Sequence, residues 1–305
     1  MSKKSMTEEK DDRLFLSPKV NQYGSHMIMT NVNKPTKVKY LSIDTRFCDE
    51  YNYNKTANFQ FTLPNKLTDI KSISIMNIEL PMSFYNISLA LGNNTFSIQF
   101  TNGTTTVITI PDGNYDLTSV GNTNLKTQLN TLLTGTNITF DISGSYATFI
   151  GSNSAALHFD TGSLGLFDKF NLKSKFGWLL GFRQPYYVLS SSILGESFYQ
   201  LSSPRYLYLV IDEFSNTNPN SFLTELPTHS INKNIIARIS LNRTIYPFGS
   251  ILLANFINGY LLSDTRNYYN KIDIQKMNIQ LVDEYGRPIN LNGLDFSFSM
   301  MLEYE

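Results

Sequence analysis

Residues 296–305 alternate between two kinds of side chain in a way typical of a half-buried β-strand. Successive side chains of a strand point to opposite faces, so residues two apart share a face. The pattern therefore predicts a strand with one face against an apolar core. One face carries Phe296, Phe298, Met300, Leu302 and Tyr304, and the other carries Ser297, Ser299, Met301, Glu303 and Glu305.

Similar alternation, or a short apolar run between turn residues, recurs from Val38 onward and predicts a protein built mainly of β-strands. Turn signals separate the runs: Asn102-Gly103 tolerates the positive φ of a tight hairpin, and Pro111–Asn114 is typical of a β-turn. The expected strands are 59–63, 70–80, 96–100, 107–110, 138–142, 146–150, 155–159, 206–211, 235–241, 272–282 and 295–304.

Two of these segments change parity along their length. In residues 70–80 the apolar positions shift from odd to even at Met76, and residues 272–282 make a similar change near Gln275. One extra residue in a strand moves every later side chain to the other face, which is what a β-bulge does. The sequence therefore predicts a bulge in each of these two strands.

One segment has the periodicity of a helix. Four leucines from Leu125 to Leu133 fall on a single helical face, Asn122 or Thr123 can cap its start, and Gly135 can end it. A second apolar segment, Lys175–Phe182, is short and interrupted by glycine, so it is expected to be a packed turn and not a helix.

The strand count predicts the fold class. About eight strands lie in the two outer parts of the chain, the number found in one jelly roll. We therefore expect a mainly β protein: a jelly-roll-like antiparallel β-sandwich built from both ends of the chain, with an inserted small α+β domain. The expected sandwich covers residues 37–91 and 186–305, and the insert covers residues 92–185. Two sandwiches in series remain an alternative that periodicity does not separate.

The beginning of the sequence predicts an exposed, flexible segment. Residues 1–36 lack periodicity, and Met1–Arg13 contains four bases and four acids, so a flexible N-terminal arm without a secretory signal is expected. Cys48 is the single cysteine, which excludes an intrachain disulfide and favours a reducing compartment. No run of 18 apolar residues occurs, so no transmembrane segment is expected.

The charge balance excludes several classes of protein. The formal net charge is zero, 16% of residues are charged and 32 are asparagine. A general nucleic-acid binder needs a positive field, and a disordered chain needs high net charge and few apolar residues, whereas 41% are apolar here. Neutral surfaces repel each other little, so the composition favours association with other protein chains.

Residues that could perform chemistry are scattered. None of His26, His158 and His229 has another His or a Cys at metal-ligand spacing, and His158 is expected to be a packed strand residue. Cys48 has no cluster of positive charge that would activate it, so a half-buried structural thiol is expected.

The acidic residues predict structural roles. The pair Asp112 and Asp116 precedes a helix, where Asp commonly bonds to the backbone, and Asp44, Asp49 and Glu50 stand close to basic residues. No phosphate-binding glycine motif occurs. We therefore assign no catalytic, cofactor-binding or metal residue and expect no cofactor and no enzyme activity.

Several segments, taken in order, resemble the minor capsid proteins of nucleocytoplasmic large DNA viruses. The resemblance runs from about residue 38 to the end, and the order of the segments is its specific part. The segments are Leu41–Phe47, Asn58–Pro64, Ile73–Tyr85, Ile108–Tyr115 with the following helix, Gly177–Phe182, Tyr206–Asp212, Asp283–Arg287 and Asp295–Phe298.

The resemblance implies a non-enzymatic protein of the virion, assembled in the host cytoplasm. It implies a cement role, in which the chain bridges capsomers of an icosahedral shell by binding the major capsid protein, other minor capsid proteins and copies of itself. Two alternatives stay open: a penton protein at the vertices, and a carbohydrate-binding attachment module. Tyrosine pairs could stack on sugars in the second alternative, at Tyr51 and Tyr53, Tyr186 and Tyr187, and Tyr268 and Tyr269.

Overall fold

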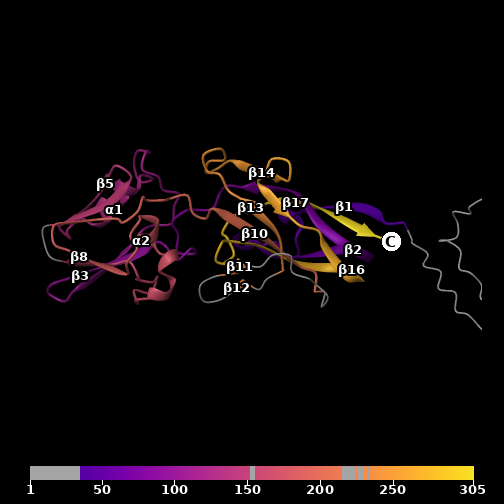
Figure 1. The fold of residues 1–305 in the computed structure, drawn as a ribbon, viewed down its shortest axis with the longest axis horizontal. Helices are drawn as coiled ribbons and strands as arrows, with labels where there is room; N and C mark the ends of the chain where they lie inside the picture. The colour runs from indigo at the N-terminus through magenta and orange to yellow at the C-terminus, as the bar shows by residue number, and fades with distance from the viewer. Residues whose placement is uncertain (1–34, 152–154, 215–223, 226–229, 232–233) are drawn as a thin grey trace, which may run out of the picture.

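β-strands dominate the computed structural model, which describes residues 35–151, 155–214, 224–225, 230–231 and 234–305. The arm expected at residues 1–36 lies outside the described residues up to residue 34. The described chain forms two lobes, each with an apolar core of its own (Figure 1). We call residues 35–85 and 204–305 the large lobe, and residues 86–203 the small lobe.

Eight antiparallel strands from both ends of the chain form the sheet of the large lobe. Their order is β1-β17-β2-β16-β10-β13-β15, and β14 pairs with β2. This arrangement confirms a mainly β, jelly-roll-like fold in which both chain ends contribute to one curled sheet. The strands are β1 (Lys37–Asp44), β2 (Asn58–Pro81), β10 (Tyr206–Asp212), β13 (Ile235–Ser240), β14 (Ile251–Asn255), β15 (Leu261–Ser263), β16 (Arg266–Val282) and β17 (Ser297–Tyr304).

The strand β2 holds this sheet together because its 24 residues pair with three other strands. Both predicted bulges are confirmed. In the pairing of β2 with β17, Ser299 lies opposite Asn77 and Met300 lies opposite Ile75, so Met76 is the extra residue. In β16 the register against β2 shifts between Ile274 and Lys276. These irregularities let the sheet bend around its core.

The core of the large lobe follows the predicted alternation. Phe298, Met300 and Leu302 of β17 are almost fully buried, and Phe296 packs edge-on against Phe59 at 5.9 Å between ring centroids. Most other core residues of this lobe are isoleucine and leucine. Their burial supplies the main stabilisation of the lobe.

The small lobe consists of two smaller sheets and a helix packed around a second core. The four-stranded sheet has the order β4-β3-β7-β8, and the three-stranded sheet has the order β5-β6-β9. The elements are β3 (Thr95–Phe100), β4 (Thr105–Thr109), α1 (Leu125–Leu132), β5 (Ile138–Ser143), β6 (Tyr146–Gly151), β7 (Ala155–His158), α2 (Phe176–Leu179), β8 (Tyr186–Leu189) and β9 (Ser192–Leu194).

The predicted helix is present as α1, with one correction at its start. Asn124 and not Asn122 or Thr123 is the N-cap, because its side chain accepts a hydrogen bond from the Thr127 amide at 3.1 Å. Leu125 and Leu129 point into the core and are fully buried. Gly135 follows the helix with a φ of +84°, which suits its predicted role at the end.

The segment Lys175–Phe182 differs from its prediction, since one helical turn, α2, forms within it. Gly177 explains why the turn fits there. A Cβ on Gly177 would stand 2.4 Å from the ring of Phe159, so a larger residue would separate this turn from the core.

Residues 186–194 also differ from their expected place. The sequence pattern assigns them to the sandwich, but β8 pairs with β7, and β9 pairs with β6, so both strands complete sheets of the small lobe. The expected boundary falls at Pro185. A proline immediately before a strand interrupts no ladder bond, and the Pro185 carbonyl accepts from the Phe159 amide at 2.8 Å.

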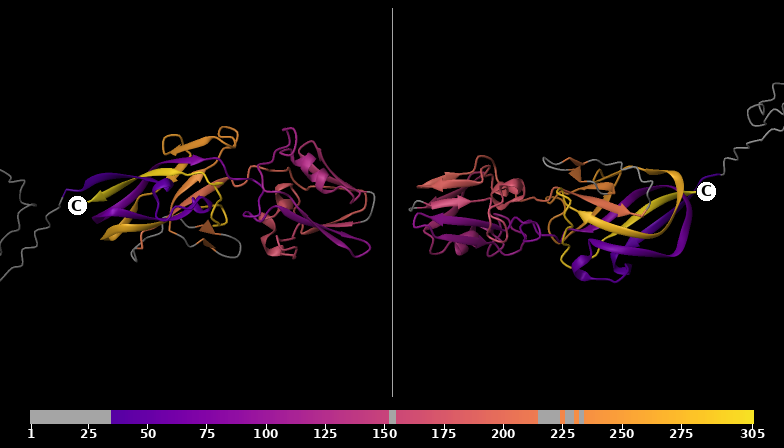
Figure 2. Two further views of the ribbon diagram at one scale, coloured as in Figure 1. Left: turned by 180° about the vertical axis from the view of Figure 1, so that it is seen from behind. Right: turned by 90° about the horizontal axis from the view of Figure 1, so that it is seen from below.

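The lobes give the molecule two unlike ends. Lys37 of β1 pairs with Tyr304 of β17, so the first described strand and the last lie side by side. Both reach the end of the large lobe that faces away from the small lobe (Figure 2).

No helix among the described residues is long and apolar enough to cross a bilayer. Short elements complete the fold: single 3-10 segments at Thr45–Phe47, Tyr53–Lys55 and Lys169–Ser174, and the pair β11 (Thr224–Glu225) and β12 (Ser230–Ile231).

Candidate functional site at the junction of the two lobes

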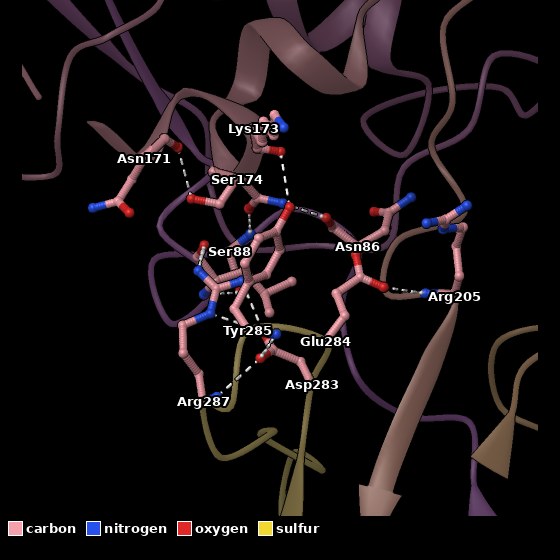
Figure 3. A network of polar contacts seen from close by, with 12 residues as sticks. Asn86, Ser88, Asn171, Lys173, Ser174, Arg205, Asp283, Glu284, Tyr285 and Arg287 are labelled. Atoms are coloured by element: carbon pink, nitrogen blue, oxygen red, sulfur yellow. Dashed lines mark hydrogen bonds and ion pairs between the residues drawn. The ribbon is translucent and has the colours of Figure 1, made fainter. Parts of the chain in front are cut away.

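The turn after β16 reaches from the large lobe to the small lobe (Figure 3). Its centre is the buried carboxylate of Asp283, which accepts from the amides of Tyr285 and Arg287, both at 2.9 Å, and from the Arg287 guanidinium at 2.8 and 2.7 Å. Arg287 also donates to the Leu91 carbonyl, and the Tyr285 hydroxyl donates to the Lys173 carbonyl at 3.1 Å. The turn is therefore fixed internally and bonds to the small lobe at Lys173, while Leu91 packs its side chain in the core of the large lobe.

Glu284 lies in the same turn and faces the connection between the lobes. Its Oε2 accepts from the amide of Arg205 at 3.2 Å. Burial raises the pKa of Glu284 above its usual range, and burial together with the Glu284 charge raises the pKa of Tyr285.

Arg243 of the large lobe forms a second set of contacts between the lobes. Its guanidinium donates to Asn114 Oδ1 at 2.9 Å and to the carbonyls of Ser203 at 3.1 Å and Phe84 at 3.4 Å, and it lies over the Phe84 ring at 5.0 Å. Burial lowers the pKa of Arg243 to about 10. Among the described residues its Nε has no partner. The half-buried Arg243 guanidinium thus bonds to oxygen atoms of both lobes and links them.

Asn86 joins the two chain segments that connect the lobes. Its Nδ2 donates to the carbonyls of Tyr115 at 2.7 Å and Leu201 at 2.9 Å, and its Oδ1 accepts from the Tyr115 amide at 2.8 Å. Asn93 donates in turn to the Asn86 carbonyl at 2.8 Å. Buried amides of this kind satisfy backbone groups without burying charge, which is one use of the high asparagine content.

A cavity of about 200 Å³ lies between the lobes. Trp178 and Arg183 form one wall and stack on each other at 4.1 Å, while Glu284, Tyr285 and Arg205 line the other. Arg183 is already bonded to the carbonyl of Trp178 at 2.9 Å. No pairing of a nucleophile with a base is seen among the described lining residues, several of which take part in the hydrogen bonds of the junction.

The other residues singled out by the sequence have structural roles. His158 of β7 stacks on Phe167 at 4.5 Å and on Tyr186 at 5.7 Å between ring centroids, as expected of a packed residue. Cys48 is half-buried, and burial raises the pKa of its thiol, which disfavours the reactive thiolate. His26 and His229 lie outside the described residues.

The carboxylates before α1 also bond to the backbone, as predicted. Asp112 accepts from the Leu89 amide at 2.8 Å, and Asp116 accepts from the amides of Thr118 at 2.7 Å and Ser119 at 2.5 Å. Across the described part of the chain, no three His, Cys, Asp or Glu side chains are grouped as metal ligands would be.

Two of the three tyrosine pairs expose only one of their two rings, so they form no sugar-stacking platform. Neighbouring residues of a strand point to opposite faces, so Tyr269 is exposed while Tyr268 is buried, and Tyr186 is exposed while Tyr187 turns inward. Tyr51 and Tyr53 are both exposed, but the Tyr51 hydroxyl is 3.3 Å from the carboxylate of Asp295, to which it donates.

No protein-family model and no curated protein matches the chain. Two solved structures are similar in fold. The mavirus penton protein is 10% identical with a TM-score of 0.41, and the match covers 89% of this chain and 100% of that one. A chain of the Sputnik virophage is 12% identical with a TM-score of 0.38, covering 88% of this chain and 98% of that one. Likeness at this level assigns the chain to no family.

Proposed function

We propose that this chain is a non-enzymatic structural protein of a viral capsid and that it occupies the vertices of the shell as a penton protein. The observation that carries the vertex position is the polarity of the fold. A jelly-roll-like lobe has both described chain ends at one pole and a second lobe at the other (Figures 1 and 2). Copies arranged around an axis can then meet side by side while their two poles face opposite sides of a shell.

The junction supports this proposal because a projecting lobe needs a rigid base. Arg243 and the Asp283–Arg287 turn bond the lobes at separate points, and Asn86 ties the start of the small lobe to its end. The neutral, amide-rich composition also suits a protein whose surface is largely covered by other subunits, since amides and hydroxyls pair without the desolvation cost of charges. Its partners would be the major capsid protein, other minor capsid proteins and further copies of the chain.

The cement role is the second candidate, favoured by the ordered segments that resemble minor capsid proteins. A cement protein lies beneath or between capsomers and need not meet copies of itself around a fivefold axis. The two candidates therefore predict different positions and different copy numbers in the same particle.

Purified particles of the virus that encodes the chain provide the test. Quantitative mass spectrometry should find the chain in the particles, and a reconstruction focused on the vertex should show five copies around each fivefold axis with the small lobe outward. Density for the chain between capsomers, and not at the vertices, would support the cement role and contradict the penton role. Absence of the chain from purified particles would refute both.

A further inference from the structure

Two strand edges of the large lobe are free on opposite sides of one layer. In that layer β17 and β2 lie between β1 and β14. Among the described strands, β1 pairs with β17 alone and β14 with β2 alone, so each is an edge strand of the layer. On β14 the Leu253 carbonyl and the Asn255 amide are bonded to the Asn258 side chain. Free edges of this kind commonly accept a strand or a surface from another chain.

The β14 side carries an unusual concentration of exposed apolar side chains, which we call the apolar edge. Residues 244–265 contain one charged residue, Asp264. Phe256 and Ile257 at the tip of the loop are 77% and 96% exposed. Large exposed apolar surfaces of this kind mark protein contacts. The apolar edge consists of Ile245, Phe248, Ile251, Leu253, Phe256, Ile257 and Leu262.

The tip of the apolar edge is held in shape by its own side chains. The Asn255 amide donates to Asn258 Oδ1 at 3.1 Å, and the Asn258 amide donates to Asn255 Oδ1 at 2.9 Å. Asn258 also donates to the Leu253 carbonyl at 2.5 Å. The two apolar residues are thus presented by an ordered turn, so little conformational entropy is lost when they are buried.

The β1 side has complementary chemistry, and we call it the β1 edge. Tyr40 is 67% exposed, and the exposed Val38 lies two residues before it on the same face of the strand. Lys37 and Lys39 are exposed and pair with no described carboxylate, and Lys39 lies over the Tyr304 ring at 5.5 Å. Val38 and Tyr40 lie on one face of β1, opposite Glu303 and Met301 of β17, and Lys37 and Lys39 lie on the other face, so the β1 edge carries apolar side chains and two lysines.

The apolar edge has the opposite charge. Asp264 is exposed at the end of β15, and Glu79 is exposed on β2 opposite Leu253 of β14. Neither makes an ion pair with a described residue. Complementary potentials on two surfaces favour and orient their association.

We propose that the β1 edge of one copy docks on the apolar edge of a second copy. The two surfaces lie on opposite sides of the same chain, so the contact is head-to-tail and repeats from copy to copy. Zero net charge leaves little repulsion between copies. The inference deepens the proposed function and rests on it for its role, because a penton protein meets copies of itself around the vertex.

The test uses the full chain and three single variants at exposed positions. Ile257→Asp disrupts the apolar edge, Tyr40→Asp disrupts the β1 edge, and Leu164→Asp, on an 86% exposed residue of the small lobe, is the matched control. Native mass spectrometry and mass photometry at micromolar concentration report the assembly, and far-UV circular dichroism verifies the fold of each variant.

The wild-type chain and Leu164→Asp should form a ring or a series of oligomers, whereas Ile257→Asp and Tyr40→Asp should each be monomeric. An equimolar mixture of the last two should form dimers and nothing larger. The intact β1 edge of Ile257→Asp meets the intact apolar edge of Tyr40→Asp, and the dimer has no further intact pair.

A monomeric wild-type chain would overturn the proposal, and so would loss of assembly in Leu164→Asp. A mixture that stays monomeric, beside an oligomeric wild type, would show a contact between like surfaces and would also overturn it. The outcome is separate from that of the capsid proposal. A chain that assembles through these edges but is absent from particles keeps this inference and refutes the capsid role.

Discussion

The two lobes bury different kinds of side chain. The core of the small lobe contains six phenylalanine rings among its isoleucine and leucine side chains, and Phe159 and Phe182 stack at 4.7 Å between centroids. The core of the large lobe is mostly aliphatic and adjoins a buried ion pair, in which Arg266 Nη1 donates to Glu213 Oε2 at 2.7 Å. The rings of the small-lobe core are Phe96, Phe140, Phe149, Phe159, Phe176 and Phe182.

The lobes also differ in how the chain builds them. The small lobe is one continuous segment, residues 86–203, whereas the sheet of the large lobe joins the two outer parts of the chain. A continuous segment with its own core can fold without the rest, while the large lobe forms only when both parts are present. We therefore expect each lobe to have its own unfolding transition. Contacts at the junction are then the means by which the unfolding of one lobe affects the other.

The largest effect is expected from Arg266→Met in the large lobe. Removal of the cation leaves the Glu213 carboxylate buried with the Tyr268 hydroxyl, which donates to it at 2.7 Å, as its remaining side-chain partner. Breaking a buried ion pair in this way costs about 3–5 kcal/mol of unfolding free energy. Urea unfolding followed by far-UV circular dichroism measures the loss.

The double variant Arg266→Met/Glu213→Gln is the control for charge, and it should recover part of the lost stability. Trp178, the single tryptophan, belongs to α2 of the small lobe and borders the junction, so its fluorescence transition should shift less than the far-UV transition in Arg266→Met. An equal shift of both transitions would contradict separable lobes.

Leu129→Ala should destabilise the small lobe and leave the large lobe largely unaffected. Leu129 is fully buried on the inner face of α1, so its truncation leaves a cavity and costs about 3 kcal/mol. The Trp178 fluorescence transition should move to lower urea concentration. Thr127→Ala, on the exposed face of the same helix, should leave it nearly unchanged. A similar loss in both variants would argue against the core role of this face.

Asn86→Ala should destabilise the small lobe, because all its side-chain partners belong to that lobe. The substitution removes three hydrogen bonds and leaves buried backbone groups of Tyr115 and Leu201 unpaired, at a cost of about 2 kcal/mol. In urea unfolding the Trp178 fluorescence transition should move to lower urea concentration. Asn54→Ala, at an exposed position of the large lobe, should leave that transition unchanged, and an unchanged transition in Asn86→Ala would contradict the role of Asn86.

Glu284→Gln should have the smallest effect, and its sign depends on pH. Burial raises the pKa of Glu284, so its protonated form is favoured in the folded protein. The resulting stability is fully present below the ordinary value of 4.5 and is lost as pH rises through the folded pKa. The amide of the variant stays neutral at every pH, so the variant should have the higher Tm at neutral pH. The two Tm values should converge at about pH 4, and a constant difference would exclude this cause.

Periodicity is enough to predict the strands that alternate and the bulge at Met76, because a face change is visible in the sequence itself. It fails at β14, where Ile251–Asn255 is short and begins with four successive apolar residues, so no period can be read from it. It also misplaces residues 186–194, because pairing partners depend on tertiary structure and not on local pattern.

The junction shows where prediction of the site ends. The Asp283–Arg287 segment is recognisable as a turn, because its residue types favour one locally. Arg243 and Asn114, which are 129 residues apart, give no signal, since closeness at such separation is created by the fold. Asn86 is likewise hidden among many asparagines, and burial alone distinguishes it from the exposed ones.

The single hydrogen bond between Asn86 and Leu201 has a consequence for how such a protein can change. It brings the start and the finish of the small lobe to within 2.9 Å, so the large lobe provides one compact port through which the chain leaves and returns. A replacement domain would therefore need its own two ends close together, and it would also have to supply partners for Arg243 and Tyr285 of the large lobe.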